Sequence, residues 1–226
     1  MHKTLVLYLL LFTIAVFSSS GLAAESVKGC HCFKDRTYNP LAKFAADDYI
    51  LATTFNSLLS KYFGISKKQI VLLKMQGSIG QDDLIIALSL SKLSVIPLEK
   101  ILDLKNQKKT WQDVTADPMI SNLQPSHTLQ ALRAGTVPSE VAINAANEII
   151  SSFFLIPPET VNQLRDKGLT EKELALLFIL SSISGRSTEE LELQHEQGGK
   201  SWSEIADSLG VMPVDAGKHI LNFTQK

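Results

Sequence analysis

The sequence contains one short phrase twice: KTWQDV at residues 109–114 and KSWSEI at residues 200–205. These phrases hold both tryptophans of the chain, which lie 91 positions apart. In each phrase a threonine or serine precedes the tryptophan, and an acidic residue follows three positions after that hydroxyl. This spacing is typical of the capping box that begins an α-helix. The two phrases therefore predict two short helices at equivalent places of a helical unit that is written twice.

Outside these phrases, helical signals recur in the same order on both sides of residue 135. Apolar residues follow the spacing of one helix face in residues 47–63 and again in residues 139–154. A second, shorter helix ends at Gly77 in the first unit and at Gly168 in the second, because glycine readily closes a helix. A strongly apolar helix follows in both units. The expected fold class is all-α.

The recurrence predicts four segments along the chain. They are a signal peptide (1–24), a Cys-His-Cys leader (25–46), helical repeat 1 (47–134) and helical repeat 2 (135–226). Each repeat is a multi-helix unit of about 90 residues, and two tandem copies of such a unit can stack as a bilobed domain or a short α-solenoid.

The positions kept in both repeats bear on function. Most of them are Trp, Gly, Leu, Ile, Phe, Ser and Asn, which are residues that pack and cap helices. The charged exceptions are Lys109 with Lys200 and Glu99 with Glu189. A duplicated catalytic site would repeat its chemistry in both units, and no nucleophile elbow, phosphate loop or Ser/His/Asp order stands out. The pattern favours packing over catalysis and a protein that is not an enzyme.

The first 24 residues have the organisation of a secretory signal. Lys3 gives a positive start, residues 5–17 are apolar, and residues 18–24 are mostly the small residues that a signal peptidase accepts. The apolar run is shorter than the roughly 20 residues that span a bilayer. We therefore expect an exported protein, periplasmic or secreted, with no membrane span after the signal is cleaved.

Charge argues against a nucleic-acid partner. The whole chain has a formal charge of −1, and removal of residues 1–24, which carry one lysine and no acid, changes it to −2. Such a chain lacks the basic surface that attracts phosphate backbones. Residues 205–220 resemble a helix-turn-helix, but the second helix offers only Lys218 and His219. We therefore expect no nucleic acid among its partners.

Cys30, His31 and Cys32 are the most unusual local feature. Two thiols and an imidazole suit copper(I), or zinc if further ligands come from elsewhere. The same pair could form a strained disulfide, act as a thiol redox site, or carry a lipid on Cys30. The chain has no other cysteine to complete a metal site. The three residues are therefore candidate metal ligands, with an inert or disulfide-bonded pair as the alternative.

A second group of candidate ligands lies on one predicted helix. Glu192, His195 and Glu196 have i, i+3 and i, i+4 spacing, which places their side chains on one face. The matching stretch of the first repeat has no such groups. The sequence favours an exposed, charged helix end over a metal site here.

Two segments resemble known sequences. Residues 200–211 and 29–36 are similar to segments of uncharacterised exported bacterial helical-repeat proteins, in which a Gly-Lys-x-Trp-x-x-Ile-Ala helix recurs after a run of short helices. The resemblance implies an exported repeat protein and brings no activity, cofactor or catalytic residue.

These observations together favour an exported, non-enzymatic binding or scaffold protein. Duplicated packing without duplicated chemistry leaves a groove between related lobes as the natural place for a protein or peptide partner, such as a helix. The alternative function is metal binding or thiol redox chemistry at Cys30, His31 and Cys32, with no cofactor expected otherwise. An enzyme whose site is assembled from distant residues ranks third.

Overall fold

The computed structural model describes residues 33–75, 79–108 and 110–224. In these ranges every regular element is helical: thirteen α-helices, one short 3-10 helix (η1, Pro40–Ala42) and no strand. The predicted all-α class is confirmed. In chain order the α-helices are α2 (Asp47–Phe63), α3 (Lys67–Met75), α4 (Gln81–Ser94), α5 (Leu98–Gln107), α6 (Trp111–Thr115), α7 (Pro118–Ser121), α8 (His127–Arg133), α9 (Pro138–Phe154), α10 (Pro158–Asp166), α11 (Glu171–Ser184), α12 (Thr188–Glu196), α13 (Trp202–Ser208) and α14 (Pro213–Asn222).

The helix starts follow the capping signals of the sequence. The Thr110 hydroxyl accepts a hydrogen bond from the Asp113 backbone N–H at 3.1 Å, and the Ser201 hydroxyl accepts one from Glu204 at 3.0 Å. Thr170 and Glu173 form a complete capping box at the start of α11. These bonds satisfy backbone donors that a helix cannot satisfy by itself. The two tryptophan helices are therefore where the repeated phrase predicts them.

Three helices of the first half have the same lengths as three helices of the second half. α2 and α9 each have 17 residues, α3 and α10 each have 9, and α4 and α11 each have 14. The turns between them also match. The Ser60 hydroxyl donates to the Ile65 carbonyl at 2.6 Å, and the Ser151 hydroxyl donates to the Ile156 carbonyl at the same distance.

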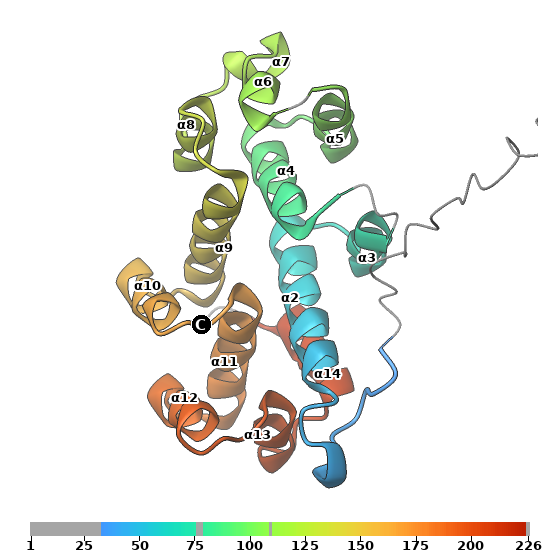
Figure 1. Cartoon of the computed structure of the whole chain (residues 1–226), viewed down its shortest axis with the longest axis vertical. Coiled ribbons are helices and arrows are strands. Elements are labelled where there is room, and N and C mark those ends of the chain that lie inside the picture. The colour runs from blue at the N-terminus through green and yellow to red at the C-terminus, as the bar shows by residue number, and fades with distance from the viewer. Residues whose placement is uncertain (1–32, 76–78, 109, 225–226) are drawn as a thin grey trace, which may run out of the picture.

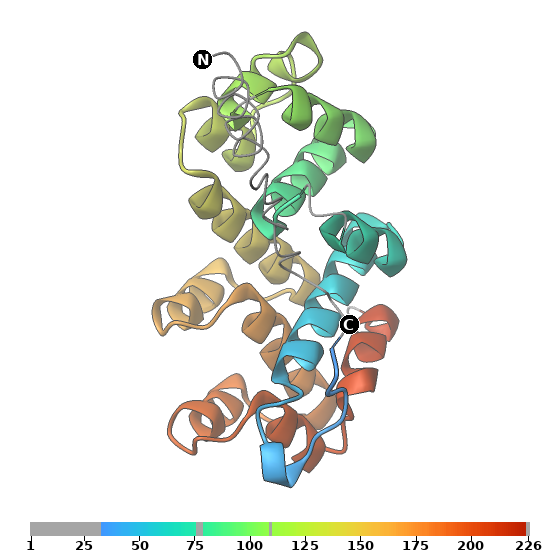
Figure 2. The same cartoon turned by 45° about the vertical axis from the view of Figure 1, so that its right-hand side comes forward.

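The first helix of each half packs against the other half of the chain. α2 lies beside α14 and α11, and α9 lies beside α4 (Figures 1 and 2). The contact between α2 and α14 is the most extensive of any helix pair in the described ranges. One continuous core of buried apolar side chains therefore joins residues on both sides of the expected boundary at 134 and 135.

No helix of the described residues combines the length and the apolar character that a membrane crossing requires.

Asp47 links the start of α2 to α13, the helix of Trp202, by hydrogen bonds. Its carboxylate accepts hydrogen bonds from the backbone N–H groups of Trp202 at 3.1 Å and Ser203 at 2.9 Å, and from the Ser203 hydroxyl at 2.7 Å. Asp47→Ala leaves these N–H groups without their acceptor, so we expect the free energy of unfolding to fall by about 1–2 kcal/mol. Asp48→Ala is the matched control, because Asp48 is the exposed acidic residue next in the same turn. Urea denaturation of both variants measures the difference, and equal losses would contradict this role.

Candidate functional site

The predicted ligands Cys30, His31 and Cys32 lie outside the described residues, so the metal or redox hypothesis for them stays a prediction. Within the described ranges, no group of three or more His, Cys, Asp or Glu side chains is placed to hold a metal ion.

The second candidate group, on α12, is engaged in structural contacts. Glu192 is only 4 % exposed, and the Lys167 ammonium lies 2.7 Å from its carboxylate. His195 stacks on the Trp202 ring with 4.3 Å between centroids, and its Nδ1 lies 2.7 Å from the Lys200 carbonyl oxygen. Because that carbonyl can only accept, Nδ1 carries the proton. The expectation of an exposed charged helix end was wrong for Glu192 and His195, since both are held against neighbouring helices.

The two tryptophans have matching surroundings. Trp111 is 2 % exposed, and its indole N–H donates to the Asp83 carboxylate at 2.5 Å. Trp202 is 1 % exposed, and its indole N–H donates to the Glu173 carboxylate at 2.9 Å. Burial raises the pKa of Glu173, but hydrogen bonds from Thr170 and Trp202 outweigh it and lower the pKa overall. Both carboxylates stand at the third position of an apolar helix, so the tryptophans are packing residues.

Lys74, in the last turn of α3, is a partly buried cation. Its ammonium donates to the Asn56 side-chain oxygen at 2.6 Å and lies 3.5 Å from the Gln81 side-chain oxygen. Burial and, to a smaller extent, nearby Lys172 lower its pKa from 10.5 to about 8, and Glu171 opposes the change. Gln81 in turn donates to the Glu171 carboxylate. These contacts join the starts of α4 and α11.

The pKa of Lys74 predicts a pH dependence of stability. The folded-state pKa of about 8 lies below the 10.5 of the unfolded chain, so between these pH values the unfolded state binds more protons. Stability contributed by Lys74 therefore rises with pH in this window. Between pH 7.5 and pH 10 we expect the wild-type chain to gain about 2 kcal/mol relative to Lys74→Met. Lys68→Met, at an exposed position of the same helix, is the control and should follow the wild type. A Lys74→Met variant with the wild-type pH profile would contradict the assignment.

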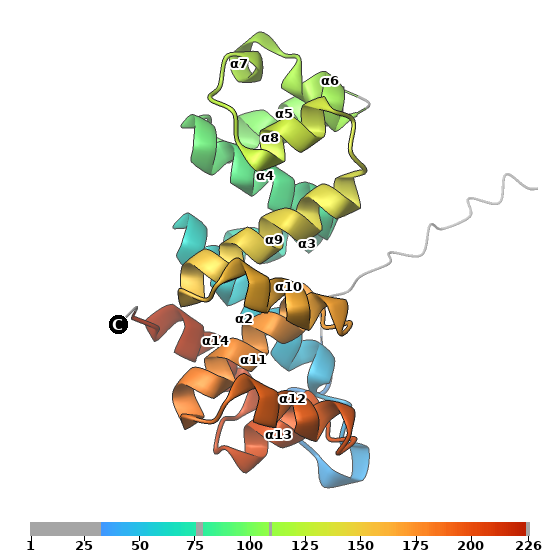
Figure 3. The same cartoon turned by 90° about the vertical axis from the view of Figure 1, so that its left-hand side faces the viewer.

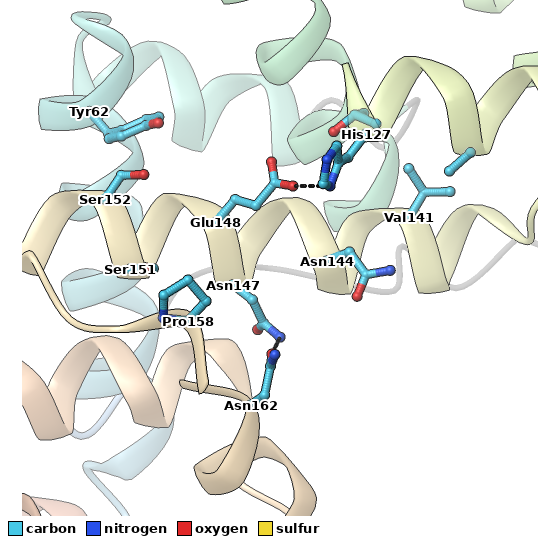
Figure 4. Close-up of a pocket in the computed structure, with 12 residues that line it drawn as sticks. Tyr62, His127, Val141, Asn144, Asn147, Glu148, Ser151, Ser152, Pro158 and Asn162 are labelled. Atoms are coloured by element: carbon cyan, nitrogen blue, oxygen red, sulfur yellow. Dashed lines mark hydrogen bonds and ion pairs between the residues drawn. The ribbon is translucent and has the colours of Figure 1, made fainter. Parts of the chain in front are cut away.

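A groove of about 580 Å³ lies along α9. We call it the α9 groove. Its floor is α9, which lies between α8 and α10 (Figure 3), and residues of these two helices form its walls. Tyr62 at the end of α2 stands at one end of the groove (Figure 4). Its volume lies in the range of ligand-binding pockets.

The lining of the α9 groove is mostly neutral and polar. Asn144, Asn147, Glu148 and Asn162 contribute carboxamides and a carboxylate, and serine and threonine hydroxyls complete the set (Figure 4). The Asn147 side-chain N–H donates to the Asn162 oxygen at 3.2 Å. His127 Nδ1 lies 3.7 Å from the Glu148 carboxylate, but these side chains are 91 % and 54 % exposed, so the pair contributes little energy. This lining supplies hydrogen-bonding groups along an open surface.

The groove is open because α8 stands away from α9. On the opposite side of the molecule α14 presses against α2, and Gly217 makes the close approach possible. A Cβ atom on Gly217 would lie 2.6 Å from the Ser57 hydroxyl and 3.0 Å from the Thr53 carbonyl oxygen. The contact between α8 and α9 is much smaller.

The side chains of α2 and α9 differ at positions matched by their place in each helix. Counted from the first residues of α2 and α9, Thr53 and Ser57 correspond to Asn144 and Glu148. Thr53 and Ser57 lie where α14 approaches α2 most closely. The matched residues of α9, Asn144 and Glu148, have larger side chains. The α9 groove thus lies at the positions of α9 that match those covered by α14 on α2.

Sequence reasoning did not find this groove. In the sequence, asparagines kept in both units read as packing residues, and nothing singles out Asn144, Asn147, Glu148 or Asn162. The one usable signal was the difference between the units at these positions, where Thr and Ser in one become Asn and Glu in the other.

No family model matches this chain, and neither a curated protein nor a solved structure matches it. The function is therefore inferred from the groove itself.

Proposed function

We propose that this protein is an exported, non-enzymatic binding protein whose α9 groove receives a helical segment of a partner protein. One observation carries the proposal: on α2, the positions that correspond to the groove are covered by a helix of the same chain, α14, whereas on α9 they are open. An amphipathic helix laid in a groove is a common mode of recognition between proteins.

The proposal includes the duplication itself, as two copies of one helical unit. The equal helix lengths and the matching serine–carbonyl bonds support it. So do the two tryptophans, each bound through its indole N–H to a carboxylate at the third position of an apolar helix. The first helix of each copy packs on the other copy, so the two copies interlock.

The ends of the two sites also correspond. Phe223, which follows α14, lies against Phe153 with 5.3 Å between ring centroids. Phe153 is the sixteenth residue of α9, and Tyr62 is the sixteenth residue of α2. Tyr62 stands at the end of the α9 groove. A helix docked in the groove would therefore end on Tyr62 as α14 ends near Phe153.

Export remains part of the proposal and depends on residues 1–24, which have the charge and apolar pattern of a signal peptide. A protein partner outside the cytoplasm follows from it. Mass spectrometry of the protein from its native compartment tests this part, and an intact N-terminus there would contradict cleavage.

Binding can be tested with a peptide of residues 212–223, which contains α14. We expect the fluorescently labelled peptide to bind the full chain saturably in an anisotropy titration. Asn144→Trp fills the groove from its floor and should abolish binding, whereas Asn106→Trp, at an exposed position of α5, should not.

The comparison of the two tryptophan variants separates the α9 groove from other binding surfaces. A peptide that displaced α14 from α2 would still bind the Asn144→Trp variant. The proposal is wrong if the peptide does not bind the wild-type chain, or if both tryptophan variants bind it equally well.

A further inference from the structure

On α2, two lysines of α3 donate to side-chain oxygens of the helix. The Lys67 ammonium donates to the Thr53 hydroxyl, and the Lys74 ammonium donates to the Asn56 side-chain oxygen at 2.6 Å. Lys67 also lies over Gly217, since a Cβ atom there would be 3.0 Å from its ammonium nitrogen. The acceptors of this site are therefore supplied with donors from within the chain.

The α9 groove lacks both of these amines. Pro158 stands at the position of Lys67, the first residue of the helix, and has no donor. Arg165 stands at the position of Lys74, but it donates to the Leu169 carbonyl at 2.9 Å and pairs with Glu171 at 3.4 Å. It is therefore directed to other partners. The residues that line the groove include no lysine or arginine.

The acceptors have remained in the groove. The side-chain oxygen of Asn147 is buried, and it has no hydrogen-bond partner within the described part of the chain. The corresponding oxygen of Asn56 has its lysine. Glu148 adds a carboxylate on the side of α9 that faces His127, whereas Asn147 points toward Asn162 of α10 (Figure 4). An acceptor that is buried without a donor is unfavourable until a ligand supplies one.

From these contacts we infer that the partner helix carries a lysine or arginine in the middle of its docking face, which pairs with Glu148. This inference rests on the proposed function and names the chemistry of the partner. The partner supplies the cation that α3 supplies to the other site. Its neighbouring residues on that face are small or apolar, as on α14, where Pro213, Ala216, Gly217 and Ile220 are buried.

The α9 groove also has room for a basic side chain. On α2 the lysine of α3 occupies the room above the crossing, so α14 has glycine there. On α9 the shorter Pro158 leaves that room to the partner. A basic side chain at the position of Gly217 would therefore reach the floor without the obstruction that Lys67 causes on α2.

The test uses two variants of the 212–223 peptide, Gly217→Lys and Gly217→Gln, which are similar in length and differ in charge. Binding to the full chain is measured by anisotropy at pH 8. We expect the lysine peptide to bind about three- to tenfold more tightly than the glutamine peptide.

Substitutions of Glu148 test whether this residue causes the preference for the lysine peptide. Glu148→Gln should remove the preference for the lysine peptide, and Glu148→Lys should reverse it in favour of a Gly217→Glu peptide. Glu140→Lys is the matched control, because it places the same charge on an exposed turn of α9 away from the groove lining. It should keep the preference for the lysine peptide.

Two results would overturn the inference, and they differ in what they imply. If both peptides bind equally to the wild type and to the Glu148 variants, while Asn144→Trp abolishes binding, the basic residue is wrong and the helix-binding function stands. If neither peptide binds, the inference and the proposed function fail together.

Discussion

Replacing Trp202 by alanine is expected to lower the free energy of unfolding by about 3–5 kcal/mol, the range for removal of a large buried aromatic side chain. The ring is 1 % exposed and stacks on His195. Its loss opens a cavity and removes the hydrogen bond that Glu173 accepts at 2.9 Å. Urea denaturation followed by circular dichroism measures the effect.

Trp202→Phe separates these contributions. Phenylalanine keeps most of the ring volume and loses the indole N–H, so we expect a smaller loss of about 1–2 kcal/mol. Trp111→Ala should resemble Trp202→Ala, because Trp111 is equally buried and donates to Asp83. Losses under about 1 kcal/mol for both alanine variants would mean that the tryptophans do not hold the core.

Gly217→Leu is expected to lower the free energy of unfolding by about 2–3 kcal/mol through overpacking. A Cβ atom at this position already lies 2.6 Å from the Ser57 hydroxyl, so a larger side chain forces α14 away from α2. Because these two helices make the most extensive contact of the described chain, part of the core opens with them. Chemical denaturation and hydrogen exchange of the α14 amides report the two effects.

The control for Gly217→Leu is Lys218→Leu. It introduces the same side chain at the next position of α14, where Lys218 is 71 % exposed and pairs only with Asp215. We expect a change within about 0.5 kcal/mol, as for other surface substitutions. Equal losses in the two variants would show that α14 does not depend on a close approach at Gly217.

The sequence predicted where the helices begin and end better than which helices pack against each other. Capping residues such as Thr110, Thr170 and Ser201 act within one turn, so local sequence is sufficient to place the starts of these helices. Apolar periodicity gives the buried face of α2, but it does not say which helix covers that face. The pairing of α2 with α14 joins residues far apart in the chain and could not be predicted from local pattern.

The candidate site was harder to predict for a physical reason. A groove forms where neighbouring helices leave part of a helix surface uncovered, and local sequence does not show which helices will cover it. The sequence of α9 has the pattern of an ordinary helix with a buried face. The opening depends on Glu148 and Asn144 in place of Ser57 and Thr53, and on the short reach of Pro158. The burial of Glu192 was missed because its partner, Lys167, follows α10 and lies 25 residues away in the sequence.

The α9 groove is expected to accept a helix as α2 accepts α14. The side-chain amide N–H groups of Asn144, Asn147 and Asn162 line this groove and give separate signals in a nitrogen-15 NMR spectrum of the labelled chain. On titration with the Gly217→Lys form of the 212–223 peptide, we expect these three signals to shift together and to saturate at one peptide per chain. Unchanged signals for all three, with shifts confined to other surfaces, would contradict the account.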